Sequence, residues 1–269
     1  MDSGLNGEHV LITGSSGGIG QAIAQLFDEE GCCLSLHYNK NKEQILKFSS
    51  ELVGDHCLLQ ADLSSESQTE KLFQDSIDTY GRIDRLVVNH GIWPGKSVPV
   101  HEMALEKWDK TIAINLRAAF MCSKQFIQNL VTFPKKSASI VFIGSTAGVF
   151  GEAGHADYAV SKSGLHGLML SLKNEIIHIA SRGRVNIVAP GWTITPMTEE
   201  FLKDHESVRS ALQTMPLRKL ARSEDIARIV VFLSSDRLAS HISGQIITVA
   251  GGMEGRKLFE PHEIDIDGI

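Results

Sequence analysis

The sequence has only four cysteines and no long hydrophobic run. Because the cysteines show no metal-ligand spacing, we expect no metal site and interpret Cys32, Cys33, Cys57 and Cys122 as small packing residues in a reducing compartment. Apolar runs such as the one ending at Leu233 are too short to cross a bilayer. The first ten residues contain no cationic start and no apolar core, so we expect no secretory leader and a cytoplasmic location.

The chain also lacks an excess of basic residues. Its formal net charge of −6 excludes a broadly basic face for nucleic acid or anionic lipid, so we expect neither partner. An apolar fraction of 42% suits a globular core. The composition therefore favours a globular protein that acts on a small molecule.

Short β-branched runs alternate with longer amphipathic stretches along the chain. Several expected strands are nearly all apolar, as in a parallel sheet covered on both faces. The alternation predicts an α/β fold of the Rossmann type, a doubly wound, seven-stranded parallel sheet with helices on both faces. The expected strands are residues 9–14, 32–37, 56–62, 85–90, 139–145, 184–190 and 244–250. The expected helices are residues 18–30, 43–52, 66–80, 105–130, 158–180 and 223–234.

No linker, repeat or low-complexity segment interrupts the chain, which predicts one domain over residues 1–269. Residues 192–216 are too long for a simple connection and predict a lid-like insertion, either a mobile lid or a permanently packed one. The tail, residues 253–269, follows the last expected strand. It is interpreted either as disordered or as packed on another subunit.

A glycine-rich loop, TGSSGGIG at residues 13–20, joins the first expected strand to the first helix. A pyrophosphate group needs backbone N–H groups at a helix N-terminus with no side chains in the way, and glycines supply that clearance. Taken alone, the loop is also compatible with a tight strand-to-helix turn or with an S-adenosylmethionine-dependent methyltransferase.

Tyr158 and Lys162 are spaced four residues apart on an expected helix, so both side chains lie on one face. A neighbouring ammonium lowers the pKa of a tyrosine, and carbonyl reduction needs an acid that protonates the developing alkoxide. Ser145 ends the fifth expected strand, where its hydroxyl can polarise a substrate oxygen. A methyltransferase has no use for this pair, so the set favours an oxidoreductase.

With these motifs in this order, the chain resembles the classical short-chain dehydrogenase/reductase family over about residues 8–252, and is similar to its 3-oxoacyl-acyl-carrier-protein reductases. The matching features are residues 13–20, Asp62, residues 89–91, Asn115, Ser145, Tyr158, Lys162 and residues 190–191. The resemblance implies a catalytic tetrad of Asn115, Ser145, Tyr158 and Lys162. It also implies that Asn115 holds a water in a relay from Lys162, and that the enzyme acts on CH–OH donors with NAD(P) as acceptor (EC 1.1.1.-).

The cofactor contacts follow from the same resemblance. We predict them to be Gly14, Ser16, Gly17, Gly18, Ile19, Gly20, Tyr38, Asn39, Lys40, Asp62, Leu63, Asn89, Gly91, Tyr158, Lys162, Pro190, Gly191, Thr193 and Thr195. The sequence departs from the family after the fourth strand, where His90 replaces a small residue. His90 is interpreted as packed or hydrogen-bonded, with a catalytic role as the alternative.

The end of the second expected strand bears on the choice between NAD and NADP. An acid there would bind the ribose 2′-hydroxyl and repel a 2′-phosphate, but Tyr38 stands at that position and no carboxylate occurs before Glu43. Asn39 can donate to a phosphate and Lys40 can supply charge. We therefore expect NADP(H), although Gly17 stands where NADP-dependent relatives often have arginine, and Lys40 is also compatible with a solvated turn.

Several apolar and aromatic residues follow strand ends or flank the tetrad, which predicts an apolar substrate pocket. These are Trp93, Ala147, His155, Trp192 and Met197, with Ser145 at the reacting carbonyl. The tryptophans are equally compatible with core or interface positions. The expected function is interconversion of a ketone and a secondary alcohol, in a homotetramer or homodimer. The alternative is a non-catalytic NAD(P)-binding regulator on the same fold.

Overall fold

Seven strands run parallel in one sheet in the computed structural model, which describes residues 2–264. The sheet order is β3-β2-β1-β4-β5-β6-β9, so the predicted seven-stranded, doubly wound parallel sheet is confirmed. Its strands are β1 (His9–Thr13), β2 (Cys33–Tyr38), β3 (His56–Gln60), β4 (Arg85–Val88), β5 (Ser137–Ile143), β6 (Arg182–Pro190) and β9 (Ile246–Val249). Two short strands, β7 (Thr193–Ile194) and β8 (Ala221–Arg222), pair separately. Every residue of β1, β4 and β5 is buried, because helices cover both faces of the sheet.

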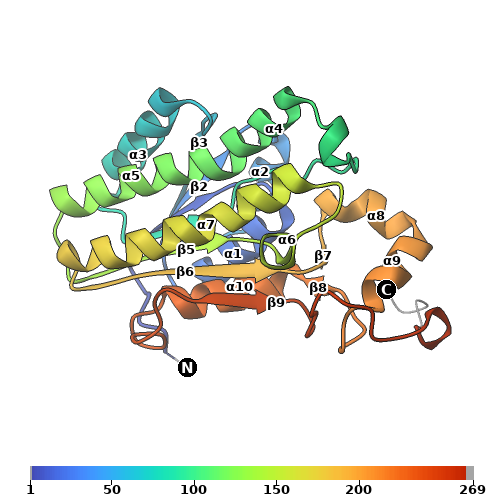
Figure 1. The fold of residues 1–269 in the computed structure, drawn as a ribbon. Helices are drawn as coiled ribbons and strands as arrows, with labels where there is room; N and C mark the ends of the chain where they lie inside the picture. The colour runs from blue at the N-terminus through green and yellow to red at the C-terminus, as the bar shows by residue number, and fades with distance from the viewer. Residues whose placement is uncertain (1, 265–269) are drawn as a thin grey trace.

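Helices cover the sheet in two layers, each with its own apolar core (Figure 1). One core lies under α3 (Glu66–Tyr80), α5 (Ala118–Thr132) and α7 (Ala156–Glu175). The other lies under α1 (Gly18–Glu29) and α10 (Ser223–Ser234). The remaining helices are α2 (Lys42–Ser49), α4 (Leu105–Ile112), α6 (Thr146–Phe150), α8 (Glu199–Lys203) and α9 (His205–Leu212). Short 3-10 turns lie at Val100–Glu102, Ile176–His178, Pro196–Thr198 and Pro261–Glu263.

The order of the strands creates a switch point between β1 and β4. Chain connections leave β1 toward β2 and β3 on one side, and leave β4 toward β5, β6 and β9 on the other. A crevice therefore opens at the carboxyl ends of these two strands, which is where ligands bind in doubly wound sheets.

The expected helix over residues 105–130 contains a π-helical turn. Helix α4 passes into the π turn at Ala113–Arg117 and continues as α5. Wider turns of this kind are frequent at functional sites. Here the turn carries Asn115, whose side chain bonds both backbone groups of Ile92 and the Ser161 hydroxyl.

Residues 192–216 contain β7, a 3-10 turn, α8 and α9. Their apolar side chains form a small core of their own with part of the tail, including Leu212, Phe201, Phe259 and Ile264. The Gln213 amide donates to the Phe259 carbonyl at 2.7 Å. The described part of the tail thus packs against this insertion, and residues 265–269 lie outside the described residues.

None of the helices in the described part of the chain is long and apolar enough to pass through a membrane.

Candidate active site

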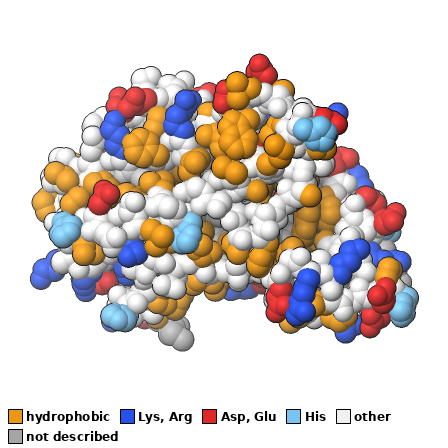
Figure 2. Space-filling model, in the orientation of Figure 1, with side chains coloured by type: hydrophobic (Ala, Val, Ile, Leu, Met, Phe, Trp, Pro, Cys, Tyr) orange, Lys and Arg blue, Asp and Glu red, His pale blue; other side chains and the backbone are white. Residues whose placement is uncertain are grey.

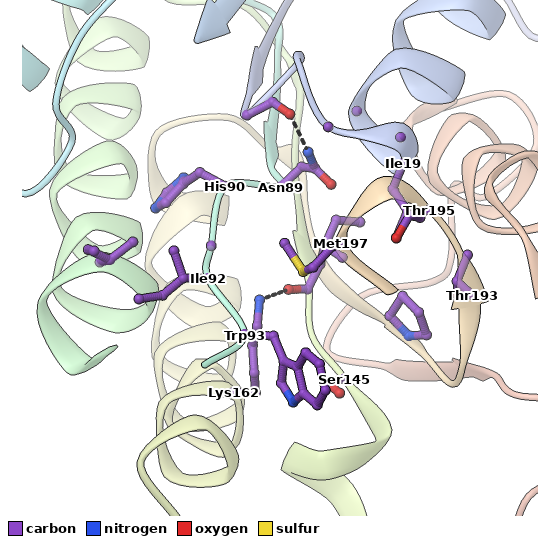
Figure 3. Close-up of a pocket in the computed structure, with 18 of the residues that line it drawn as sticks. Ile19, Asn89, His90, Ile92, Trp93, Ser145, Lys162, Thr193, Thr195 and Met197 are labelled. Carbon is purple, nitrogen blue, oxygen red and sulfur yellow. Dashed lines mark hydrogen bonds between the residues drawn. The ribbon is translucent and has the colours of Figure 1, made fainter. Parts of the chain in front are cut away.

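A cavity of about 810 Å³ lies at the carboxyl ends of the central strands. Its walls come from the loops after β1, β4, β5 and β6, from α7 and from the first turns of residues 192–216 (Figure 3). Most of the residues expected at the cofactor and the substrate line it together.

The glycine loop follows β1 at one end of the cavity and is so tightly built that side chains cannot replace two of its glycines. Gly14 has a φ of +68°, and a Cβ there would meet the His90 Cα at 2.8 Å. A Cβ on Gly20 would meet the Gly14 carbonyl oxygen at 2.3 Å. The Asn89 amide donates to the carbonyls of Thr13 and Gly14, which ties the loop to the end of β4. Helix α1 begins at this loop without a side-chain cap, so its first N–H groups face a space that a pyrophosphate fits.

His37 fixes the loops on the β2 side of the cavity. Its Nδ1 accepts from the Gly14 N–H at 3.0 Å, and its Nε2 lies 3.0 Å from the Ala61 carbonyl, which accepts its proton. Burial lowers the pKa of His37 to about 4, so the ring is neutral in this tautomer near pH 7. Asn39, Lys40, Asp62 and Leu63 line the cavity beyond it. Tyr38 is buried and does not line the cavity, because neighbouring residues of a strand face opposite sides.

Ser145, Tyr158 and Lys162 meet on the cavity wall where β5 ends. Ser145 caps α6 by accepting from the Ala147 N–H at 3.1 Å, and it lines the same cavity as Tyr158. Gly148 lets α6 approach α7 closely, since a Cβ there would meet Lys162 atoms at 2.8–2.9 Å. Lys162 is buried one helical turn beyond Tyr158, and its Nζ donates to the Ile143 carbonyl at 2.8 Å (Figure 3).

The charge states of this set differ from the simple expectation. Burial raises the pKa of Tyr158 to about 12; the hydrogen bond with Ser145 opposes the rise, and the nearby Glu152 charge adds to it. Burial lowers the pKa of Lys162 to about 8. The Lys162 ammonium lies 5.9 Å from the Tyr158 ring centroid and bonds Ile143. Burial dominates at Tyr158, so its pKa is raised and not lowered as the spacing predicts. Tyr158 is therefore protonated at neutral pH, as a proton donor must be.

Asn115 lies just behind the cavity rather than on its wall. Its Oδ1 accepts from the Ile92 N–H at 2.8 Å, and its Nδ2 donates to the Ile92 carbonyl at 3.0 Å. Gly91 separates it from Lys162: a Cβ on Gly91 would lie 3.2 Å from Asn115 Oδ1 and 3.3 Å from Lys162 Nζ. A side chain at residue 91 would crowd both groups.

The predicted substrate residues divide into two groups. Trp93, Ala147, Trp192 and Met197 line the cavity, whereas His155 does not. His155 is buried behind Trp93, with ring centroids 5.4 Å apart. Trp93 and Trp192 meet edge to face at 5.9 Å, and Trp192 stacks on Phe201 at 3.8 Å. An aromatic wall thus extends from α7 to α8.

The structure adds lining residues that no motif indicated. They include His37, Ile92, Thr146, Glu152 and Met253. His90 also lines the cavity; its Nδ1 lies 2.8 Å from the Thr13 hydroxyl, in keeping with a packed, hydrogen-bonded residue. Within residues 2–264, no three His, Cys, Asp or Glu side chains lie close enough together to hold a metal ion.

The two buried histidines predict an acid-sensitive fold. Burial lowers the pKa of His37 to about 4 and of His90 to about 3, from an ordinary 6.5. Below pH 6.5 both histidines bind protons in the unfolded chain but stay neutral in the folded chain. The stability present above pH 6.5 is therefore lost as the pH falls toward 4. The expected loss is at most about 1.4 kcal/mol per pH unit for each histidine. Urea unfolding between pH 7 and pH 4 measures it.

The variants His37→Asn and His90→Asn keep a polar atom near each Nδ1 position but do not titrate. Combining them should flatten the dependence of unfolding free energy on pH in this range. An unchanged slope in the double variant would assign the acid sensitivity to other groups.

Comparison with known proteins places the chain in a family. The model of the family described as Enoyl-(Acyl carrier protein) reductase matches residues 14–254. The 3-oxoacyl-(acyl-carrier-protein) reductase FabG of Thermotoga maritima is 32% identical over 252 residues, which are 93% of this chain and 98% of the relative. The FabG reductase of Staphylococcus aureus is 34% identical over 247 residues, 90% of this chain and 96% of the relative.

Solved structures give the same result. A Brucella melitensis short-chain dehydrogenase/reductase, described as a glucose/ribitol dehydrogenase, superposes with a TM-score of 0.85 at 32% identity, covering 94% of this chain and 98% of that one. Levodione reductase superposes with a TM-score of 0.86 at 28% identity, covering 92% and 98%. The chain therefore belongs to the short-chain dehydrogenase/reductase family and is an oxidoreductase.

Proposed function

We propose that the protein interconverts a ketone and a secondary alcohol by hydride transfer with NADP(H), using Tyr158 as the general acid and base. The observation that supports this most is the meeting of Ser145, Tyr158 and Lys162 on one wall of a cavity whose other end is a glycine loop shaped for a pyrophosphate. A non-catalytic regulator would need only the glycine loop. The relatives are also named as reductases.

The cofactor's nicotinamide supplies the hydride for the carbonyl carbon. The chain's own residues handle the oxygen: Ser145 donates a hydrogen bond to it, and the Tyr158 hydroxyl gives it a proton. Lys162 contributes positive charge beside Tyr158, because its pKa of about 8 leaves it mostly protonated at pH 7. Asn115 holds the π turn against Ile92, and this contact keeps Gly91 in position beside Lys162.

The test is a turnover assay with ketones, diketones and 3-oxoacyl thioesters, each with NADPH and with NADH. Oxidation of either cofactor that depends on a carbonyl substrate supports the proposal. Cofactor binding without turnover of any carbonyl compound would favour the regulator.

NADPH is expected to exceed NADH in kcat/KM by at least about tenfold, worth roughly 1.4 kcal/mol. Asn39 and Lys40 line the cavity beyond β2, and neither would repel a 2′-phosphate. Asn39→Asp introduces a carboxylate on that wall and should reverse the preference by repulsion. Asn41→Ser, a neutral change beside it, serves as the control. Equal kcat/KM values for the two cofactors in the wild type would contradict the expectation.

We also propose a homotetramer or homodimer formed through the helices on one face. Large apolar side chains are exposed along α4, α5 and α7 and their ends, over the face that Figure 2 shows. They are Leu105, Phe120, Val131, Val160, Leu170 and Ile177. Several large apolar side chains exposed on one face favour association through that face. Light scattering at micromolar concentration should give two or four times 29.4 kDa, and Phe120→Lys with Leu170→Lys should lower that mass. A monomer mass for the wild type would contradict the proposal.

Residues 192–216 are proposed to close over bound substrate. Trp192 and Met197 line the cavity, whereas α8 and α9 pack with the tail in a core separate from the two main ones. This arrangement suits a segment that moves as one piece over the cavity and excludes water from it.

A further inference from the structure

Glu152 is a charged residue on the lining of the cavity that also carries the aromatic residues Trp93 and Trp192. It lies between α6 and α7, immediately after Gly151, whose φ of +80° ends α6 in a sharp turn. Its side chain keeps 28% exposure and faces the same cavity as Trp93, Trp192 and Tyr158. The reaction proposed above gives this carboxyl group no role.

The protein does not neutralise Glu152. Among the described residues its one ion-pair neighbour within 4 Å is His155, whose Nε2 lies 3.8 Å from the carboxylate. Burial lowers the pKa of His155, with the Lys107 charge adding to the effect, so this ring is neutral near pH 7. Partial burial raises the pKa of Glu152, and hydrogen bonding from the Trp93 indole opposes the rise. The carboxylate therefore has acceptor capacity available to a group that enters the cavity.

Glu152 also lies on the same part of the cavity as the reacting group. It is 3.8 Å from His155, whose ring packs on Trp93, and it lines the cavity together with Trp93 and Tyr158. A substrate whose carbonyl oxygen lies at Tyr158 thus has its neighbouring atoms beside Glu152. A hydroxyl group there would donate to the carboxylate and satisfy it. An alkyl group there would leave the carboxylate unpaired, and an anionic group would be repelled.

We infer that Glu152 determines specificity by selecting carbonyl substrates that carry a neutral hydroxyl group next to the ketone. The inference rests on the proposed oxidoreductase reaction and names its substrate class. Lys110 and Lys162 also line the cavity, and their positive charges disfavour an ammonium group as the donor.

The test compares two ketones of nearly equal shape, 2-hydroxycyclohexanone and 2-methylcyclohexanone, with NADPH as cofactor. The wild type should favour the hydroxy ketone by about tenfold or more in kcat/KM, as expected for a hydrogen bond to a charged group. In Glu152→Met the ratio of the two kcat/KM values should fall to about one, because kcat/KM for the hydroxy ketone alone decreases. Glu152→Gln keeps an acceptor oxygen and should give an intermediate ratio.

Activity on 2-methylcyclohexanone shows that each variant is folded, and Glu102→Met removes a carboxylate outside the cavity as a matched control. A ratio near one in the wild type, or an unchanged ratio in Glu152→Met, would overturn the inference and leave the proposed function intact. Retained turnover of both ketones by Tyr158→Phe would instead overturn the proposed function.

If the wild type reduces neither ketone, ligand binding is measured in place of turnover. The quenching of tryptophan fluorescence by cyclohexane-1,2-diol and by 2-methylcyclohexanol is then compared in the enzyme with NADPH, because Trp93 and Trp192 lie on the cavity wall. Tighter binding of the diol that Glu152→Met abolishes supports the inference. Equal binding of the two alcohols, or binding of neither, overturns it.

Discussion

Replacing Tyr158 with phenylalanine is expected to lower kcat by about 10²–10⁴ while NADPH affinity stays within a few-fold. The Tyr158 phenol is protonated at neutral pH and lies on the cavity wall together with Ser145 and Lys162. Phenylalanine keeps the ring that packs beside Lys162 and removes only the proton. Rapid-mixing kinetics with NADPH and the best ketone from the assay, together with calorimetric titration of NADPH, separate the two effects.

Ser145→Ala is the companion variant. It removes the hydroxyl that caps α6 at 3.1 Å and lines the cavity together with Tyr158, so it should lower kcat as well. Val160→Ala, an exposed residue on the same helix, should change neither kcat nor affinity. A kcat for Tyr158→Phe close to that of the wild type would remove Tyr158 from the proton-transfer step.

The patterns in the sequence predicted the sheet well because its central strands are buried on both faces. An apolar run such as residues 140–143 of β5 has few alternatives to a central parallel strand, and glycines at positions 14 and 20 leave the turn after β1 little freedom. The order of the glycine loop, Ser145, Tyr158 and Lys162 then indicated which cavity to expect. These features are local, so they are visible in sequence.

Other features depend on tertiary contacts and were missed. Helix α6 has five residues, too few for a helical period to show. The π turn depends on Asn115 reaching Ile92 and Ser161, which are distant in sequence. Glu152 belongs to no motif; only its place between Ser145 and Tyr158 could have indicated that it faces the cavity.

The end of β2 shows a different limit. Counting from the glycine loop selects Tyr38 as the residue beside the cofactor, but strand pleating points His37 toward the cavity and Tyr38 away from it. Counting residues along the chain gives the position of a residue along the strand. The face of the sheet on which its side chain lies depends on the register of the strand. Asn39, one residue later, is therefore the better position for testing cofactor choice.

Replacing Gly20 with alanine is expected to weaken NADPH binding by roughly ten- to a hundredfold, and to lower the unfolding free energy by about 1–3 kcal/mol. The added Cβ would meet the Gly14 carbonyl oxygen at 2.3 Å, Asn89 Nδ2 at 2.8 Å and the Ser15 Cα at 2.9 Å. Two of these atoms are backbone, and Asn89 is held by its bonds to Thr13 and Gly14, so the loop itself must move. Calorimetric titration of NADPH and urea unfolding measure the two losses.

Gly167→Ala provides the matched control, because a Cβ there meets nothing within 4 Å and the residue lies inside α7. It should leave NADPH affinity unchanged and raise stability slightly, as alanine is the better helix former by about 1 kcal/mol. Gly17→Ala separates protein strain from cofactor contact, since its Cβ would meet only the Gly14 carbonyl at an ordinary 3.6 Å. A loss of NADPH affinity in Gly17→Ala with normal stability would show that the cofactor itself needs the clearance. The contrary result is that Gly20→Ala binds NADPH as tightly as the wild type and unfolds at the same urea concentration. That result would show that the loop can move to accept the Cβ, and that the cofactor site does not require glycine at this position.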